Sequence, residues 1–376
     1  MIFIGETDTG DRVEYHDTKR YLWILSLVLP LTPIVGIWLF LAFDEQTLFL
    51  LFPLIFGYII IPILDFLVGE DHSNPPAEVV DQMSGDNYYR ILLHISVPLF
   101  WIGYIVPVWL VASYDLPIWS VLALAFNVGQ INGTALTVGH ELGHKQSRFD
   151  RFMAKLACAI SGYGHFCIEH NRGHHTHVAT PEDCASARYN ETIYHFLLRE
   201  IPGALVRGWS LETRRLKQRG LNWWHWRNDI LQGYAITAVV SGVLIYLFGF
   251  QVLPFMLIAS FSGWYALTQA NYVEHYGLKR LKMENGRYEP CAPHHSWNTN
   301  HTVSNLMLFH LQRHSDHHAN PLRPYQALRN FDDLPRLPSG YPGSFMLAAI
   351  PPLWFRVMNP KVLEWAGGDM EKVNTG

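Results

Sequence analysis

The sequence predicts an all-α integral membrane protein with six transmembrane helices. Composition is the first reason: 49% of the 376 residues are hydrophobic and only 16% are charged, against roughly 25% charged residues in ordinary soluble domains. Apolar runs long enough to cross a bilayer, about 20 residues each, are the second reason. They lie near residues 21–43, 47–68, 91–112, 118–139, 230–248 and 252–273. A further run at 152–166 is short and contains Lys155 and His165, so we expect a buried or interfacial segment there.

The distribution of Lys and Arg predicts the orientation of these helices, because both residues are retained on the cytoplasmic side of membranes. The loops near 44–46, 113–117 and 249–251 hold none of the 28 Lys and Arg residues, whereas residues 140–229 hold 13. We therefore expect both termini and the large segments 140–229 and 275–376 on the cytoplasmic side. The polar N-terminus predicts no cleavable signal peptide, and we treat residues 1–376 as one domain. The segment after 335 is expected to form part of a cytoplasmic helical cap.

The motif GHELGHK, residues 139–145, has the His-Glu-x-x-His spacing of zinc proteases. Two histidines four residues apart on a helix bind Zn, Fe, Cu or Ni alike. The chain holds 20 histidines, and further clusters occur in EHNRGHH, NYVEHYGL and LQRHSDHHA. The nine clustered histidines are His140, His144, His170, His174, His175, His275, His314, His317 and His318. A catalytic zinc site uses three protein ligands, so nine histidines argue against a protease.

The spacing within these clusters predicts a shared di-metal site in the cap. His170 and His174 are four residues apart and lie on one helical face, while His175 is turned by about 100° and can reach a second ion. His314, with residues 317 and 318, also uses i, i+3 and i+4 spacing. Nine imidazoles divided between two ions give four or five each, which leaves open positions for oxygen chemistry.

Carboxylates next to the histidines are candidates to accept the second imidazole N–H and so fix its tautomer. These candidates are Glu141, Glu169, Glu274, Asp316 and Asp183. In a protease, Glu141 would instead be the general base. The four cysteines contain no C-x-x-C pair, so we expect neither a disulfide framework nor a thiolate metal site.

With GHELGHK, EHNRGHHTHVATPED, NYVEHYGL and LQRHSDHHANPLRPYQALR, the chain resembles the bacterial membrane-bound alkane 1-monooxygenases, or alkane hydroxylases. The match runs from the first crossings to about residue 330. NYVEHYGL adds a ninth histidine to the three motifs of the wider group of membrane desaturases and hydroxylases. Cys184 departs from the proline expected after PED, in a loop where the change casts little doubt on the metal site.

This resemblance implies a non-haem di-iron enzyme of the bacterial inner membrane that hydroxylates the terminal methyl of medium or long n-alkanes to 1-alkanols. It also implies O2 as co-substrate and rubredoxin as electron donor, reduced by an NADH-dependent reductase. The nine histidines are then the iron ligands, whereas imidazoles alone leave iron, copper, zinc and nickel open. Without C-x-x-C pairs, the rubredoxin is expected on another polypeptide or on a domain beyond residue 376. No nucleic-acid partner is expected.

Two further groups of residues are assigned roles in this enzyme. Bulky residues expected to set the length of an apolar substrate channel are Trp38, Phe40, Phe100 and Trp264, although most membrane aromatics only pack or anchor. A basic patch at 207–219 attracts either anionic lipid headgroups or an acidic protein partner. Its members are Arg207, Arg214, Arg215, Lys217 and Arg219.

The alternatives keep the membrane scaffold but change the chemistry. A fatty-acyl desaturase, or a hydroxylase of benzylic methyl groups, would use the same histidine clusters. A zinc membrane protease would need only the motif at 139–145, and a metal transporter would need ionisable residues along its membrane helices. These helices contain few such residues.

Overall fold

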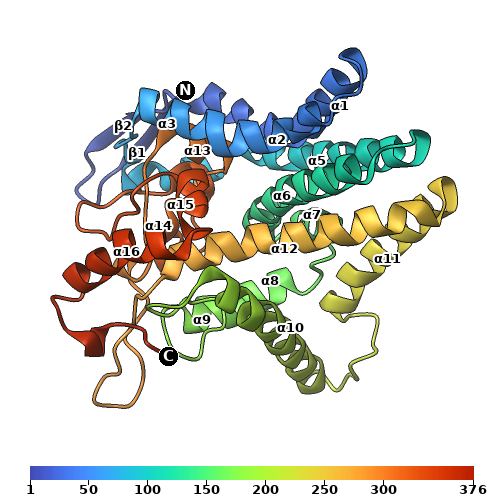
Figure 1. The fold of residues 1–376 in the computed structure, drawn as a ribbon. Coiled ribbons are helices and arrows are strands. Elements are labelled where there is room, and N and C mark those ends of the chain that lie inside the picture. Colours follow the sequence, from blue (N-terminus) through green and yellow to red (C-terminus); the bar gives the residue numbers. More distant parts are fainter.

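Helices make up almost all of the regular structure in the computed structural model, which describes residues 1–376 (Figure 1). The α-helices are α1 Thr32–Ala42, α2 Phe52–Ile55, α3 Ile61–Val68, α4 Val80–Ser84, α5 Asn87–Ser113, α6 Ile118–Gly143, α7 Arg148–Ile160, α8 Phe166–Glu169, α9 His175–His177, α10 Ile193–Gln218, α11 Asp229–Phe248, α12 Leu253–His275, α13 Thr302–Met307, α14 His314–Ala319, α15 Tyr341–Ala348 and α16 Pro351–Trp365. The 3₁₀ segments are η1 Arg20–Leu27, η2 Leu29–Leu31, η3 Thr47–Leu51, η5 Ala77–Val79, η7 Phe250–Val252, η8 Pro293–His295, η9 Tyr325–Ala327 and η10 Met370–Lys372. The π-helical segments are η4 Phe56–Ile60 and η6 His170–His174.

Six helical segments are long and apolar enough to cross a membrane, which confirms the predicted number of crossings. They are Arg20–Ala42, Thr47–Val68, Asn87–Ser113, Ile118–Gly143, Asp229–Phe248 and Phe250–His275. The first two alternate between 3₁₀, π and α geometry instead of forming one continuous α-helix. Pro30, Pro33, Pro53 and Pro62 lie at or next to these changes, because proline lacks the amide hydrogen and its ring displaces the preceding turn.

A β-hairpin at the N-terminus corrects the all-α prediction in one place. Strand β1, Ile2–Glu6, pairs antiparallel with β2, Arg12–His16. The turn between them contains Gly10 at φ +85°, a left-handed conformation that glycine adopts without steric cost. The rest of the described chain contains only isolated bridges between extended residues.

Helix α7 has 13 residues and is not among the segments long and apolar enough to cross a membrane, in line with the expectation for the short apolar run at 152–166. It buries Ala154, Ala157 and Cys158 against the bundle and exposes Arg151 and Phe152 on the opposite side. A helix with one buried face and one exposed face is typical of a segment that lies at an interface.

The two helices α6 and α12 form the centre of the bundle, and small residues let their backbones approach closely. A Cβ added to Gly129 would lie 2.4 Å from the backbone oxygen of Ala259 and 2.4 Å from Cβ of Ser262. Ser262 Oγ donates to the backbone oxygen of Phe126 at 2.8 Å. Close packing of this kind between membrane helices depends on small side chains. It brings the C-terminal ends of α6 and α12, which both carry histidines, to the same side.

The elements between and after the crossings gather at this histidine-bearing end. In Figure 1, α14, α15 and α16 lie near the end of α12, and α8 to α10 lie beneath it. Trp354 and Met358 of α16 are fully buried, and Trp354 packs on Tyr272 and Tyr276 at the end of α12 and just beyond it. The segment after 335 therefore covers the bundle end, as expected of a cap.

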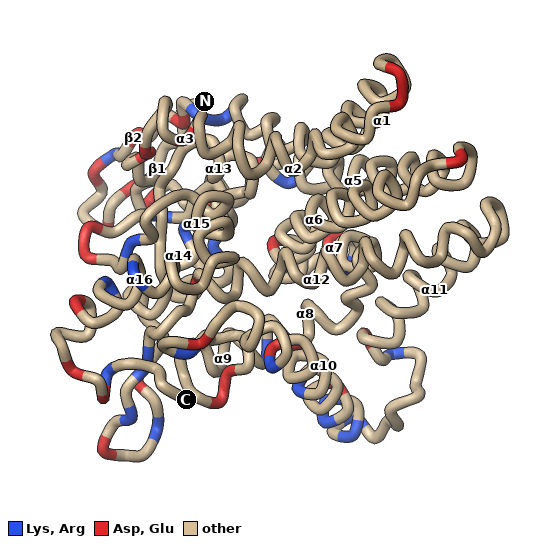
Figure 2. Tube along the Cα trace, viewed as in Figure 1, with Lys and Arg blue, Asp and Glu red and all other residues tan.

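Charge is divided along the bundle (Figure 2). Lys and Arg lie at the histidine-bearing end and on α10, whereas the opposite tips of the long helices carry only acidic residues or none. The two ends therefore differ in their Lys and Arg content, the property on which the predicted orientation depends.

Candidate metal centre

Nine buried or half-buried histidines from five segments meet at one end of the bundle. His140 and residue 144 come from the end of α6, residue 275 from the end of α12, and the others from η6, α9 and α14. They divide into two groups, and within each group the ligand atoms lie within 4.8 Å of one another. The first group is His140, His144, His170, His175 and His317. The second group is His174, His275, His314 and His318.

A π-helical segment determines which of the two groups each histidine of the EHNRGHH motif joins. A spacing of four residues predicts that His170 and His174 lie on one helical face. In the structure His170 shares the first group with His175, and His174 belongs to the second. Residues His170–His174 form a π-helix, whose wider turn places i and i+5 on one face. The expectation that His174 and His175 turn toward different groups is met, whereas the pairing of His170 with His174 is corrected.

In the first group, the Nε2 atoms face one another. His140 Nε2 lies 2.8 Å from His317 Nε2, and His175 Nε2 lies 3.0 Å from His170 Nε2 and 3.1 Å from His317 Nε2. The Nε2 atom of His144 is buried without any hydrogen-bond partner. Converging nitrogens cannot all be satisfied by sharing protons, whereas a cation between their lone pairs would satisfy them together.

The second group is arranged in the same way. His314 Nε2 and His318 Nε2 are 2.8 Å apart, and the Nε2 atoms of His174 and His275 are buried with no partner. Each of the two groups therefore fits one metal ion held by imidazole nitrogens. The donor set suits iron, copper, zinc or nickel.

Burial favours the neutral, metal-binding form of four histidines that lie outside the membrane helices, residues 144, 175, 317 and 318. Desolvation lowers the pKa of His144 to about 3 and that of His175 to about 2. The pKa values of His317 and His318 are also well below the ordinary value for the same reason. A neutral imidazole keeps the lone pair that a metal ion needs, so the fold prepares these side chains for coordination.

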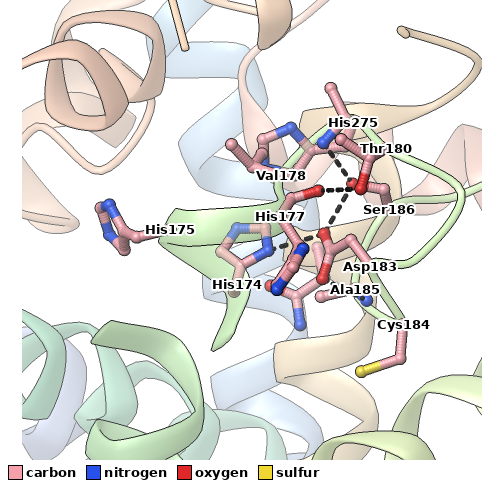
Figure 3. Close-up of polar contacts among 12 residues, drawn as sticks. His174, His175, His177, Val178, Thr180, Asp183, Cys184, Ala185, Ser186 and His275 are labelled. Carbon is pink, nitrogen blue, oxygen red and sulfur yellow. Dashed lines mark hydrogen bonds and ion pairs between the residues drawn. The ribbon is translucent and has the colours of Figure 1, made fainter. Parts of the chain in front are cut away.

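Asp183 fixes the orientation of one of these histidines (Figure 3). His174 Nδ1 lies 2.9 Å from Asp183 Oδ2, and Ser186 Oγ donates to the same oxygen at 2.6 Å. With its proton on Nδ1, His174 presents Nε2 to the second group. His275 uses a backbone acceptor instead, since its Nδ1 lies 3.3 Å from the backbone oxygen of His295. Asp183 therefore lies where a carboxylate that orients a ligand is needed.

Glu274 contacts a different histidine from the one predicted. Its Oε2 atom lies 3.2 Å from Nε2 of His314, and its Oε1 atom accepts from the hydroxyl of Tyr341 at 2.8 Å. Its position in the sequence instead predicts a contact with the neighbouring His275. Successive side chains on a helix point about 100° apart, so a carboxylate next to an inward histidine faces elsewhere.

Three further carboxylates were predicted to contact histidines, and for the same geometric reason they bind cations or backbone amides instead. Glu141 lies 3.7 Å from Lys145, and Glu169 forms an ion pair with Arg207. The last of the three, Asp316, binds Arg323 at 2.6 Å and the amide nitrogen of residue 329 at 2.8 Å. These three carboxylates therefore stabilise the segments that carry the histidines and do not orient the imidazole rings.

Arg207 of α10 links two of these carboxylates from inside the protein. Its Nη2 atom binds Glu169 and lies 2.7 Å from Asp183 Oδ1. Glu169 and Asp183 are 5% and 1% exposed. Burial alone raises the pKa of Asp183, but His174 and Arg207 outweigh it and hold the pKa well below the usual range. One guanidinium thus contacts two buried carboxylates beside the second histidine group.

Replacing Arg207 with methionine is expected to destabilise the protein by about 3–5 kcal/mol, because it leaves buried carboxylates without their cation. The measurement is thermal unfolding of the purified full-length protein in detergent. Arg214→Met is the matched control, since Arg214 is exposed on the same helix and forms no ion pair. Equal melting temperatures for the two variants would contradict the compensating role of Arg207.

Comparisons with known proteins bear on this arrangement directly. The sequence model of the family described as fatty acid desaturase matches residues 116–342. An alkane 1-monooxygenase from Ectopseudomonas oleovorans is 54% identical to the chain, over 96% of this chain and 90% of its own length. The chain belongs to the alkane 1-monooxygenase family. Alkane 1-monooxygenases from Pseudomonas putida and Alcanivorax borkumensis are 52% and 50% identical, over 96% and 97% of this chain and 89% and 90% of their own lengths. These matches confirm the resemblance seen in the histidine motifs.

Two adjoining cavities lead away from the histidines of this alkane 1-monooxygenase family member. The inner one, of about 80 Å³, reaches His140, His170 and His314. The outer one, of about 60 Å³, lies among α2, η4, α6, α13 and α15. Residues that line both cavities are Tyr58, Gln130, Thr134, Leu308 and Phe345. The Tyr58 hydroxyl lies 2.7 Å from Gln130 Oε1 and 3.1 Å from Gln269 Oε1, so the polar groups at this junction are paired with each other.

The four aromatic residues predicted to line a channel lie elsewhere. Trp38 is 63% exposed, while Phe40 and Phe100 are 1% and 3% exposed within the core. The indole of Trp264 donates to the backbone oxygen of Ser161 at 2.7 Å. None of the four lines either cavity. Apolar helices offer many aromatics, and the sequence does not say which of them face inward.

The five basic residues predicted to form one patch divide into two kinds. Arg214 and Lys217 on α10, and Arg219 just after its end, are exposed. Arg207 points inward as described, and Arg215 binds Glu212 at 2.5 Å. Residues 207 and 215 are therefore structural, because a helix turns part of any continuous basic run toward its neighbours.

Proposed function

We propose that the protein hydroxylates the terminal methyl group of medium or long n-alkanes to give 1-alkanols. The observation that carries this proposal is that histidines from both candidate metal groups, His140, His170 and His314, line one mainly apolar cavity. The alkane 1-monooxygenase relatives support the same reaction. In balanced form, an alkane, O2, two electrons and two protons give a 1-alkanol and water.

The nine histidines are proposed to hold two iron ions, five ligands for one and four for the other. Iron is the metal that the family relationship favours, and when bound it supplies the activation of O2 that an unreactive C–H bond requires. The chain itself fixes the imidazole tautomers, through Asp183 for His174 and a backbone oxygen for His275. It also buries the histidines away from bulk water, which protects a reactive oxidant from side reactions.

Substrate binding in this proposal depends on apolar burial alone. An alkane has no polar group, and each buried CH2 contributes about 0.8 kcal/mol. The two cavities accept a chain from the bundle side and bring its end to His140, His170 and His314. Because the Tyr58 hydroxyl donates to Gln130, an alkane at the junction does not have to cover an unpaired hydroxyl group. Selectivity for the terminal methyl then follows from which carbon the cavity end presents.

The decisive experiment is product analysis under 18O2. Full-length enzyme loaded with iron is supplied with reduced rubredoxin and n-octane, and the expected product is 1-octanol with one labelled oxygen. Unlabelled alcohol, or no oxidation of octane together with desaturation of a fatty acyl substrate, would contradict the proposal. Metal analysis provides an independent check: two irons per chain are expected, and a single zinc would favour hydrolytic chemistry.

The enzyme is proposed to lie in the bacterial inner membrane with its histidine-bearing end toward the cytoplasm. Support comes from six apolar helices and from the absence of Lys and Arg in the three loops at the other end. This orientation faces the site toward rubredoxin and its NADH-dependent reductase, which we propose as the electron source. The exposed residues Arg214 and Lys217 on α10, and Arg219 just after its end, are the proposed docking surface for that acidic partner.

Reversing two of these charges is expected to weaken the encounter with rubredoxin. Arg214→Glu with Lys217→Glu should raise the KM for rubredoxin by roughly tenfold at low salt and leave kcat nearly unchanged, because exposed charges mainly steer association. The measurement is octane oxidation at several rubredoxin concentrations and ionic strengths. Lys279→Glu with Arg287→Glu is the matched control on a distant loop. An equal KM in both double variants would contradict docking at α10.

A further inference from the structure

A large basic cavity lies outside the histidine site and has no part in the proposed reaction. Its volume is about 1150 Å³, and eight of its 23 lining residues are Lys or Arg, against one acidic residue, Asp229. It lies among the end of α6, helix α7, the end of α10 and the start of α11. Figure 2 shows part of this charge at the free end of α10.

Half of these eight cations have no ion-pair partner within the protein. Asp229 is already bound by Lys155 at 2.6 Å and lies 3.3 Å from Arg215. Four other basic residues of the lining have no carboxylate within ion-pair distance: Arg148, Arg151, Arg219 and Arg227. Like charges gathered around a hollow repel one another, so an anion from outside the chain would stabilise this arrangement.

The cavity lies at the level where membrane helices leave the bilayer. It is lined by residue 143 at the end of one crossing and by Asp229 at the start of another. Three tryptophans next to it, Trp223, Trp224 and Trp226, are 41%, 67% and 72% exposed. Exposed tryptophan is typical of the headgroup region of membranes. An anion bound in this cavity would therefore lie at the depth of the lipid headgroups.

The wall of the cavity also continues into apolar surface. Phe152 of α7 and Ile236 of α11 belong to the lining. Farther along α11, Val239, Val243 and Tyr246 are 65%, 50% and 88% exposed, as expected for side chains that face acyl chains. A phosphate in the basic cavity would thus have room for its attached acyl chains along α11.

We propose that this cavity binds the headgroup of an anionic membrane phospholipid. Arg151 of α7 and Arg227, on the segment before α11, contact the headgroup phosphate from two sides, and the acyl chains lie along α11. An anionic lipid fits better than an acidic protein, because the binding surface is a hollow that opens onto an apolar membrane-facing helix. This site is separate from the proposed reaction and does not depend on the metal ions.

The test uses full-length protein in nanodiscs that contain phosphatidylcholine and phosphatidylglycerol, followed by detergent extraction and native mass spectrometry. The wild-type protein is expected to retain phosphatidylglycerol in preference to phosphatidylcholine. Arg151→Gln with Arg227→Gln should weaken that retention about 25-fold, since each arginine that contacts the phosphate contributes about fivefold. Arg151→Lys with Arg227→Lys should retain the lipid within about threefold of wild type.

Matched charge loss on the outer face of α10 provides the control. Arg214→Gln with Lys217→Gln removes the same number of charges outside the cavity and should leave lipid retention unchanged, while melting temperatures in phosphatidylcholine alone show that all variants fold. Equal retention of both lipids by the wild type, or equal losses in both glutamine variants, would overturn the proposal. So would displacement of the lipid by millimolar inorganic phosphate, or an acidic protein that binds through Arg151 and Arg227 without any lipid preference.

Discussion

His275→Ala is expected to abolish 1-alkanol formation and to lower the iron content from two ions per chain to one. His275 is fully buried, and its Nε2 atom has no partner in the protein. It belongs to the group of four histidines, so its loss leaves three imidazoles and a hollow at that position. The group of five loses nothing directly and should keep its ion. We expect turnover to fall on the order of a thousandfold, because the oxidation requires both ions.

Iron content and turnover are measured on the same preparation, by elemental analysis and by the octane assay. The control is His72→Ala, which removes a histidine whose side chain is 65% exposed and should change neither quantity. His317→Ala is the complementary variant, because it belongs to the group of five. Two ions per chain in His275→Ala, with activity near wild type, would show that the proposed division of the nine ligands is wrong.

The fold and the ligand clusters could be read from the sequence because each depends on local patterns. Runs of about 20 apolar residues identify membrane helices whatever packs against them. The histidine spacings at 140–144 and 314–318 follow the period of an ordinary α-helix. The division at 170–175 could not be read in this way, because the chain adopts π geometry there. Nothing in the letters HNRGHH distinguishes that geometry from an α-helix.

Contacts between distant segments account for most of what sequence reasoning missed. Asp183 reaches His174 across a loop, and Glu274 reaches His314 from another helix. Sequence adjacency pointed to the wrong partner for Glu274, because neighbouring helical residues diverge. The inward rotation of Arg207 is another such case. Only the packing of α10 against α8 decides that its guanidinium faces Glu169 and not solvent.

The cavity beside the histidines leads to the second large expected effect, a change in substrate length for Thr134→Phe. Thr134 lies on α6 and lines both cavities. Its hydroxyl donates to the backbone oxygen of Ile131 at 2.7 Å, so its removal leaves no other side chain unpaired. A phenyl ring at this junction should separate the outer cavity from the histidines. A long alkane would then lose the burial of about four CH2 groups, or about 3 kcal/mol.

We therefore expect kcat/KM for hexadecane to fall by roughly a hundredfold, while a short alkane that fits the inner cavity keeps most of its rate. The measurement is a chain-length series under identical rubredoxin supply. Trp38→Ala is the control, because Trp38 is exposed on α1 and lines neither cavity, so the series should keep its wild-type profile. A uniform loss across all chain lengths would point to misfolding. An unchanged profile would mean that the alkane reaches the histidines by another route, because a ring at Thr134 cannot leave a path through both cavities open.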